Sequence, residues 1–217
     1  MTDITARIAR RAALEIPQHG LVNLGIGLPL SIPQYLPVGT VCVVHQEAGY
    51  IGMGPAATPA TQDATITDAA GNLVTLLPGA ACFDSLTSFA IVRGGRLDCA
   101  VLGALEVDQH GNLANWIIPG KWAPGMGGGM ELAQKARKVI ATLRHTDKEG
   151  RSKILKDCRL PLTAPRCVSV IVTEIAVFKF RLEGGLVLTD LLGDATLDEV
   201  RAKTEAEYDV QLEQAAP

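Results

Sequence analysis

The hydrophobic residues of this chain fall into short continuous runs, separated by segments in which apolar residues recur with helical spacing. Runs of four to six mostly apolar residues predict strands buried on both faces, as in a parallel sheet covered by helices. They occupy residues 21–24, 40–45, 73–77, 97–102, 113–118, 139–143, 167–172, 176–180 and 186–189. Apolar positions three or four residues apart predict helices over residues 4–16, 82–92 and 130–138, and a capping box at Thr196 opens a last helix. This alternation indicates an α/β fold with a largely parallel sheet, and no linker divides residues 1–217 into two domains.

Polar and turn-forming residues mark the connections between these elements. Residues 55–71 are polar and predict a surface loop, and Pro78 with Gly79 is expected to end the strand at residues 73–77. Residues 144–156 are the most charged stretch of the chain, and they predict an exposed loop or hairpin.

A single formal charge, that of Glu47, stands in the 47 residues from position 16 to position 62. Glu47 follows the predicted strand at residues 40–45, and open α/β sheets bind ligands at the carboxyl ends of their strands. The carboxylate either accepts hydrogen bonds from turn N–H groups or acts as a nucleophile or base. Gly49, Gly52 and Gly54 favour the second interpretation, because glycines let a substrate approach the backbone and leave N–H groups free for an oxyanion.

Glycines at three other places are candidates for substrate contact. Gly25 and Gly27 follow the first strand, but a third glycine is absent and Pro29 stands where a helix would open, so a dinucleotide site is not favoured. The remaining candidates follow the strand at residues 97–102 or precede the helix at residues 130–138, and they are Gly103, Ala104, Gly127 and Gly128. The last two form either an anion site before a helix or only a turn.

The segment Glu-Ala-Gly-Tyr-Ile-Gly-Met-Gly-Pro at residues 47–55 resembles the Glu-x-Gly-x-x-Gly-x-Gly-Pro signature of the catalytic β (B-type) subunit of 3-oxoacid CoA-transferases. The resemblance covers nearly the whole chain, because further motifs follow in the order of that family. They include Asn23-Leu-Gly-Ile-Gly-Leu-Pro29, Leu76-Leu-Pro-Gly-Ala80, Gly111-Asn-Leu-Ala-Asn-Trp116, Pro124-Gly-Met-Gly-Gly128 and Ser152-Lys-Ile-Leu155. Two departures stand out: Ala48 replaces a frequent Asn or Ser, and Glu106 replaces a common glutamine.

The resemblance implies the fold shared by CoA-transferases and ribose-5-phosphate isomerase-like proteins. It implies that Glu47 is the covalent nucleophile, which carries coenzyme A as a glutamyl thioester between two acids, with CoA as substrate and no permanently bound cofactor. It also implies that the partner is a CoA-transferase α subunit, with two copies of each subunit. Succinyl-CoA and a 3-oxo acid such as acetoacetate are the expected substrates. Acetate, butyrate or 3-oxoadipate specificity, or CoA-ester hydrolysis on the same fold, stay open as alternatives.

A second carboxylate, Glu106, follows the same predicted strand as Gly103. Two adjacent ionised carboxylates would raise one pKa and weaken a nucleophile, so we expect Glu106 to face solvent or to have a structural role.

Composition narrows the functional classes further. The net charge is −3, the pI is about 5.8, and the basic residues are spread along the chain, so nucleic-acid binding is not indicated. Prolines and glycines interrupt the uncharged segment after residue 16, which excludes a membrane span, and no signal peptide is evident. Five cysteines without a Cys-x-x-Cys pair indicate reduced, mostly buried thiols in a cytoplasmic protein, and four scattered histidines do not predict a metal site.

Overall fold

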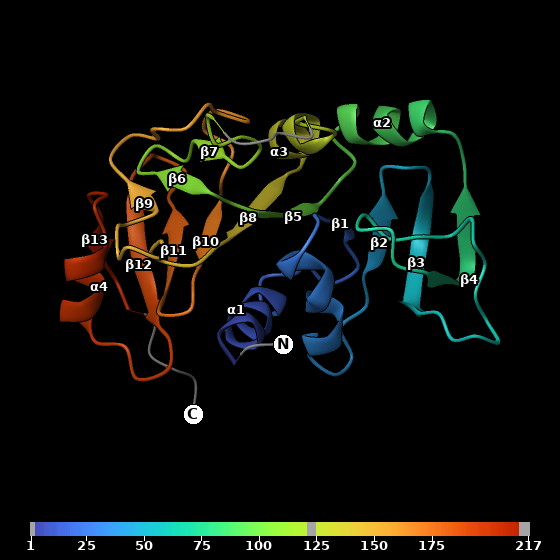
Figure 1. Ribbon diagram of the computed structural model, residues 1–217, viewed down its shortest axis with the longest axis horizontal. Coiled ribbons are helices and arrows are strands. Elements are labelled where there is room, and N and C mark those ends of the chain that lie inside the picture. The colour runs from blue at the N-terminus through green and yellow to red at the C-terminus, as the bar shows by residue number, and fades with distance from the viewer. Residues whose placement is uncertain (1–2, 121–124, 213–217) are drawn as a thin grey trace.

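The computed structural model describes residues 3–120 and 125–212, and its centre is a ten-stranded sheet (Figure 1). The strands follow the order β13-β12-β11-β10-β8-β5-β1-β2-β3-β4. Their bounds are β1 Leu21–Leu24, β2 Val43–Gln46, β3 Tyr50–Ala56, β4 Val74–Cys82, β5 Cys99–Gly103, β8 Lys138–Thr142, β10 Val170–Val172, β11 Ala176–Phe180, β12 Leu186–Leu191 and β13 Asp209–Val210. A small second sheet has the order β7-β6-β9, with β6 Glu106–Asp108, β7 Leu113–Ala114 and β9 Ile154–Leu155. Pro124, which opens one of the quoted motifs, lies outside the described residues.

Strands β10, β8, β5, β1 and β2 run parallel to one another in the middle of the large sheet. Strands β3 and β4 extend one side of the sheet and β11 and β12 the other, both in antiparallel fashion, and β13 pairs in parallel with β12. The predicted α/β class with a mainly parallel sheet is confirmed. The carboxyl ends of the five central strands therefore share one edge of the sheet.

Side chains of the central strands alternate between two hydrophobic layers. In β5, Cys99 and Val101 pack on one side, while Ala100 and Leu102 pack on the other, and all four are buried. Helix α1 (Asp3–Ala13) and the 3-10 helix η1 (Leu28–Tyr35) cover the first side. Helices α2 (Ser85–Arg93), α3 (Gly129–Lys135) and α4 (Leu197–Lys203) and the small sheet lie on the second (Figure 1). Burial on both faces explains the continuous apolar runs.

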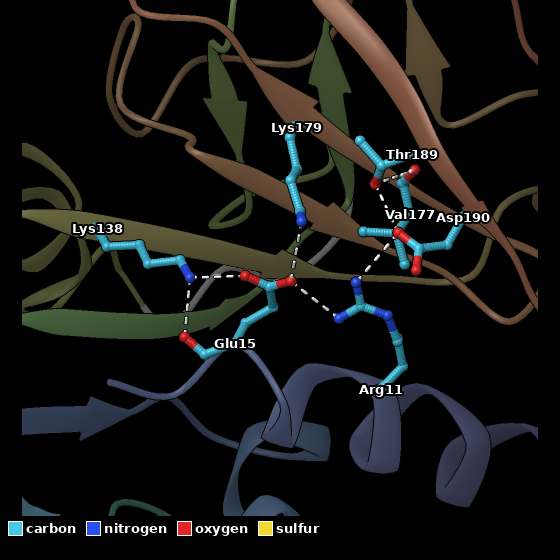
Figure 2. Close-up of polar contacts among 7 residues, drawn as sticks. All are labelled: Arg11, Glu15, Lys138, Val177, Lys179, Thr189 and Asp190. Atoms are coloured by element: carbon cyan, nitrogen blue, oxygen red, sulfur yellow. Dashed lines mark hydrogen bonds and ion pairs between the residues drawn. The ribbon is translucent and has the colours of Figure 1, made fainter. Parts of the chain in front are cut away.

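A cluster of charged side chains fastens α1 to the sheet (Figure 2). The Glu15 carboxylate, 11% exposed, lies 2.6 Å from Lys138 Nζ and 2.9 Å from Arg11 Nη1, with Lys179 Nζ at 3.7 Å. Arg11 reaches on to Asp190 of β12 at 3.1 Å. Burial would raise the pKa of Glu15, but the hydrogen bonds and charges of Lys138 and Arg11 outweigh it and hold that pKa below its usual range. Glu15 thus joins α1 to β8 and β11.

Several predicted elements differ from the structure. Residues 50–56 form strand β3, which includes the first two residues of the loop predicted at 55–71, and β4 runs through Pro78 instead of ending there. Proline is tolerated at this position because β4 is an edge strand, where a missing N–H breaks no ladder on the open side. The predicted helix at 82–92 begins only at Ser85, because Asp84 caps it by accepting the N–H of Thr87 at 2.7 Å. The strand expected at 113–118 is limited to residues 113–114.

The prediction for the cysteines is only partly correct. All five are free thiols, but only Cys99 is fully buried, and Cys82 at the end of β4 is exposed. Within residues 3–120 and 125–212, no cluster of His, Cys, Asp and Glu has the arrangement of a metal site. The same part of the chain contains no helix with the length and apolar character needed to span a bilayer.

Candidate active site

Glu47 occupies the tight turn between β2 and β3, just beyond the carboxyl end of β2. The turn closes through a hydrogen bond from the Gly49 N–H to the Gln46 carbonyl at 3.1 Å. Gly49 has φ +137°, and a Cβ there would collide with the carbonyl oxygen of Phe83. Only glycine fits this position. The turn therefore fixes the backbone on which the half-buried Glu47 side chain projects at the ligand-binding edge of the sheet.

Asn23, on the neighbouring strand β1, holds the Glu47 carboxylate. Its Nδ2 donates to Glu47 Oε2 at 2.9 Å and to the carbonyl of His45 at 3.1 Å. The Asn23 side chain is completely buried, and its Oδ1 has no hydrogen-bond partner among the described residues. The amide nitrogen must face the carboxylate, since the reverse orientation would set two oxygens against each other. This charge-assisted bond fixes one carboxylate oxygen in place.

A buried hydrogen-bond network continues from Asn23 to helix α2. Asn23 Nδ2 lies 3.2 Å from His45 Nδ1, and His45 Nε2 lies 2.9 Å from Ser88 Oγ. Because the amide nitrogen is a donor, His45 Nδ1 accepts, so Nε2 carries the proton and donates to Ser88. Ser88 then donates to the Gln46 carbonyl at 3.3 Å. Burial lowers the pKa of His45, despite the attraction of Glu47, which favours the neutral ring that this network requires.

Gly128 lies directly against Glu47. A Cβ at Gly128 would stand 3.6 Å from Glu47 Cγ and only 2.9 Å from Phe89 Cζ, so a larger residue would displace Phe89. The N–H groups of Gly27, Gly127 and Gly128 donate to no backbone carbonyl within the described residues. Among the described residues, these three N–H groups are therefore candidates for contact with a bound substrate.

Three other predicted donors are already used. The N–H groups of Gly25, Gly49 and Ala104 donate to the carbonyls of Val101, Gln46 and Thr142 at 2.8 to 3.1 Å. We therefore exclude these N–H groups as oxyanion donors in this conformation, and contact of the three residues with substrate stays a prediction. Gly103 ends β5, where its carbonyl accepts the Asn115 side-chain amide at 3.0 Å.

Gly52 and Gly54 do not present open backbone to a substrate, contrary to the prediction. A Cβ at Gly52 would lie 2.8 Å from Ala80 Cβ, and one at Gly54 would lie 2.6 Å from Thr75 Oγ1. Both glycines therefore allow β3 to pack closely against β4.

Glu106 has the structural role that the sequence predicts. Its Oε2 accepts the N–H groups of Arg159 and Leu160 at 2.8 and 2.9 Å. Asn23, His45 and Ser88 were missed as site residues. The only signal for the first two is a polar residue inside an otherwise apolar strand, and Ser88 gives none.

Comparison with known proteins identifies the class to which this fold and site belong. The Coenzyme A transferase family matches residues 5–203, and the chain belongs to that family. It is 49% identical to the beta subunit of the acetate CoA-transferase of Escherichia coli K12, over 96% of this chain and 94% of the relative. It is 43% identical to the B-type subunit of the succinyl-CoA:3-ketoacid coenzyme A transferase of Helicobacter pylori strain 26695, over 94% of this chain and 98% of the relative.

Some relatives are longer, and this chain matches only part of their length. A mitochondrial succinyl-CoA:3-ketoacid coenzyme A transferase (2A) of Mus musculus is 42% identical over 94% of this chain, which spans 39% of that protein. An acyl-CoA transferase apoenzyme structure from E. coli O157:H7 shares the fold, with a TM-score of 0.75 at 22% identity over 98% of this chain and 43% of that one. The decarboxylase AibA/AibB has the same fold, with a TM-score of 0.68 at 19% identity over 95% of this chain and 85% of that chain, so the fold alone does not fix the reaction.

Proposed function

We propose that this chain is the catalytic subunit of a CoA-transferase, in which Glu47 carries coenzyme A covalently between two carboxylic acids. The observation that supports it most is the Asn23–Glu47 hydrogen bond at the carboxyl edge of the sheet. It orients a solitary carboxylate where a ligand would bind. The relatives named as beta or B-type subunits of CoA-transferases support the same reaction class.

The reaction proceeds in two symmetrical halves. A Glu47 oxygen attacks the thioester carbon, the C–S bond breaks, and a mixed anhydride and CoA thiolate form. The thiolate then attacks the glutamyl carbonyl, which breaks the anhydride C–O bond and releases the first acid as a carboxylate. The second acid attacks the enzyme–CoA thioester, and the same steps in reverse restore the Glu47 carboxylate. Such covalent shuttling predicts ping-pong kinetics.

Two features of the site suit these steps. Asn23 holds one Glu47 oxygen and leaves the other able to attack. The N–H groups of Gly27, Gly127 and Gly128 are unclaimed by backbone carbonyls of the described residues, and each oxyanion donor is worth roughly 3 kcal/mol in comparable sites.

A partner subunit is needed to complete the site. Glu47 is only half-buried in this chain, whereas the anhydride and the thioester hydrolyse in water. Exposed apolar side chains occur within three sequence positions of Asn23, Ser88 and Gly128. They are Ile26, which is 69% exposed, Leu86, which is 72% exposed, and Met130, which is 42% exposed. The occupant that we propose is an α subunit, because the similar chains are named as beta or B-type subunits. We propose that it docks on this apolar rim of Ile26, Leu86 and Met130, with two copies of each subunit in the complex.

The names of the similar subunits point to more than one pair of acid substrates. Subunits of acetate CoA-transferase and of succinyl-CoA:3-ketoacid CoA-transferase are both similar to this chain. We favour succinyl-CoA as donor and a 3-oxo acid such as acetoacetate as acceptor. Assays of the complex with a panel of acyl-CoA donors and acids decide between these and acetate, butyrate or 3-oxoadipate.

Trapping of the covalent intermediate tests the chemistry. We expect the complex with the α subunit, incubated with acyl-CoA, to show a CoA adduct on the peptide that contains Glu47, and hydroxylamine to cleave it. Glu47→Gln should show no adduct and no turnover. Glu106→Gln is the matched control, because the amide oxygen of the glutamine still accepts the two loop N–H groups. This variant should retain both the CoA adduct and turnover. An active complex without an adduct would instead support a hydrolase or another reaction on this fold.

A further inference from the structure

A cavity of about 740 Å³ opens at the same edge of the sheet, beyond the carboxyl ends of β5, β8 and β10. Its walls are Leu105 and Glu106 after β5, the hairpin at residues 144–153 after β8, and Glu174 after β10. Small-molecule sites have volumes of roughly 300–1,000 Å³ and favour this edge of α/β sheets. Glu47 follows β2, three strands from β8, which is about 14 Å at ordinary strand spacing. The cavity is therefore separate from the candidate active site.

The three carboxylates that line this cavity are committed to holding its walls. Glu106, Asp147 and Glu174 each accept hydrogen bonds from the backbone of the surrounding loops. The donors are the N–H groups of residues 145, 149, 151, 159 and 160, at 2.8 to 3.0 Å. Such carboxylates shape the cavity rather than offer themselves to a ligand.

Arg151 and Arg159 of the lining form ion pairs, whereas its other three basic side chains are less committed. Arg144, Lys148 and Lys153 line the cavity, and within residues 3–120 and 125–212 none of them forms an ion pair. Among the described residues, Lys153 Nζ donates to the Ala104 carbonyl alone, at a long 3.4 Å. Burial lowers the pKa of Lys153 against the attraction of Glu174, so an anion beside it would stabilise its charged form. The lining thus has five basic and three acidic side chains, and the three basic ones named here have no ion-pair partner among the described residues.

The hairpin that carries these side chains is well ordered by its own hydrogen bonds. Thr146 and Ser152 form an antiparallel bridge, and the Asp147 N–H donates to the Arg151 carbonyl at 2.9 Å. The Lys153 N–H donates to the His145 carbonyl at 3.0 Å. A framework formed before binding reduces the ordering entropy that a ligand must overcome.

We propose that this cavity is a second ligand site, in which Arg144, Lys148 and Lys153 bind the phosphate groups of a phosphorylated small molecule. Three cations suit the multiple charges of phosphates, while Leu105, Ile118 and Leu160 offer apolar surface to the organic part. The phosphates have two possible sources. One is the phosphorylated end of a CoA substrate whose thiol is at Glu47, since the extended pantetheine arm spans such a distance. The other is a free nucleotide.

Isothermal titration of the assembled complex with adenosine 3′,5′-bisphosphate and with ATP tests the site. We expect at least one probe to bind, and the double variant Arg144→Gln/Lys148→Gln to bind it roughly a hundredfold more weakly, about tenfold for each lost charge-assisted contact. The control Arg96→Gln/Lys135→Gln removes two exposed charges outside the lining and should bind normally. The proposal would be overturned if neither probe binds, or if the two double variants lose the same amount of affinity for the probe. Lys148→Gln alone, in the exposed loop, should still show a tenfold loss if the double variant fails to assemble.

Kinetics of the same variants distinguish the two sources. If the site holds the end of CoA, the double variant raises KM for acyl-CoA without lowering kcat. The increase in KM is then smaller for dephospho-CoA thioesters than for CoA thioesters. If it holds a free nucleotide, KM for acyl-CoA is unchanged although the probe no longer binds. Glu47→Gln should bind the probes like the parent protein, so the result does not depend on the role proposed for Glu47.

Discussion

Asn23 donates a hydrogen bond to Glu47 from the adjacent parallel strand, across 24 positions of sequence and 2.9 Å of space. The candidate nucleophile is therefore oriented by an element other than its own turn. Register makes this possible, because Asn23 pairs with His45, two residues before Glu47. A parallel pair of strands brings both side chains to the same edge.

We expect Asn23→Ala to lower kcat roughly 10- to 100-fold, because a hydrogen bond to a charged group contributes about 1.5–3 kcal/mol. KM for both substrates should change little, since Asn23 contacts the nucleophile. Steady-state kinetics of the complex measure this, and thermal unfolding shows whether the variant is folded. Parental kcat in a folded Asn23→Ala complex would show that the contact does not orient Glu47.

Stability should fall with acidity through His145, whose ring nitrogens contact the Thr173 and Thr204 hydroxyls at 3.0 and 2.9 Å. Burial, with the charge of Lys203, lowers the pKa of His145 from 6.5 to about 4. The unfolded chain thus binds the proton more tightly, so the neutral ring's contribution is complete above pH 6.5 and is lost as the pH falls toward 4. The loss amounts to about 3 kcal/mol at most. Urea unfolding at pH 7.5 and 4.5 should show it, and His145→Gln should flatten the difference, whereas an unchanged pH dependence would refute the assignment.

The Glu15 cluster predicts a large stability effect far from the candidate active site. Glu15→Gln leaves Lys138 and Arg11 without their shared charged partner. The Glu15 and Arg11 side chains are each only 11% exposed, so we expect a loss of about 3 kcal/mol in the free energy of unfolding. Glu149→Gln, which removes an exposed ion pair with Arg151, should cost less than 1 kcal/mol. Urea unfolding measures both, and similar values for the two variants would mean that the Glu15 cluster contributes little.

Local patterns were sufficient wherever burial alone decides the structure. The strands at residues 21–24 and 176–180 were predicted with the observed bounds, because continuous apolar runs in this composition have few alternatives to a buried strand. The role of Glu47 as the candidate nucleophile followed from its isolation in an uncharged segment and from the motif around it.

The misses came from contacts between distant residues. Gly52 and Gly54 were predicted to open the backbone to a substrate, yet they lie in β3, and Gly52 is needed because Ala80 of β4 packs against it. The pairing of His45 with Ser88 joins residues 43 positions apart, and no local pattern marks a serine on a helix as part of a site. Such features depend on the register of strands and helices, which composition and spacing do not specify.

The apolar rim predicts which surface variants impair assembly with the α subunit. Leu86 is 72% exposed on α2, two residues from Ser88 of the Glu47 network, and we expect Leu86→Lys to weaken association at least tenfold by placing a charge in an apolar contact. Leu182→Lys is the matched control, since Leu182 is fully exposed in the β11–β12 turn, away from the rim. Sedimentation or native mass spectrometry of the co-expressed subunits measures the complex. Intact assembly with Leu86→Lys, at concentrations near the parental Kd, would place the partner on another face.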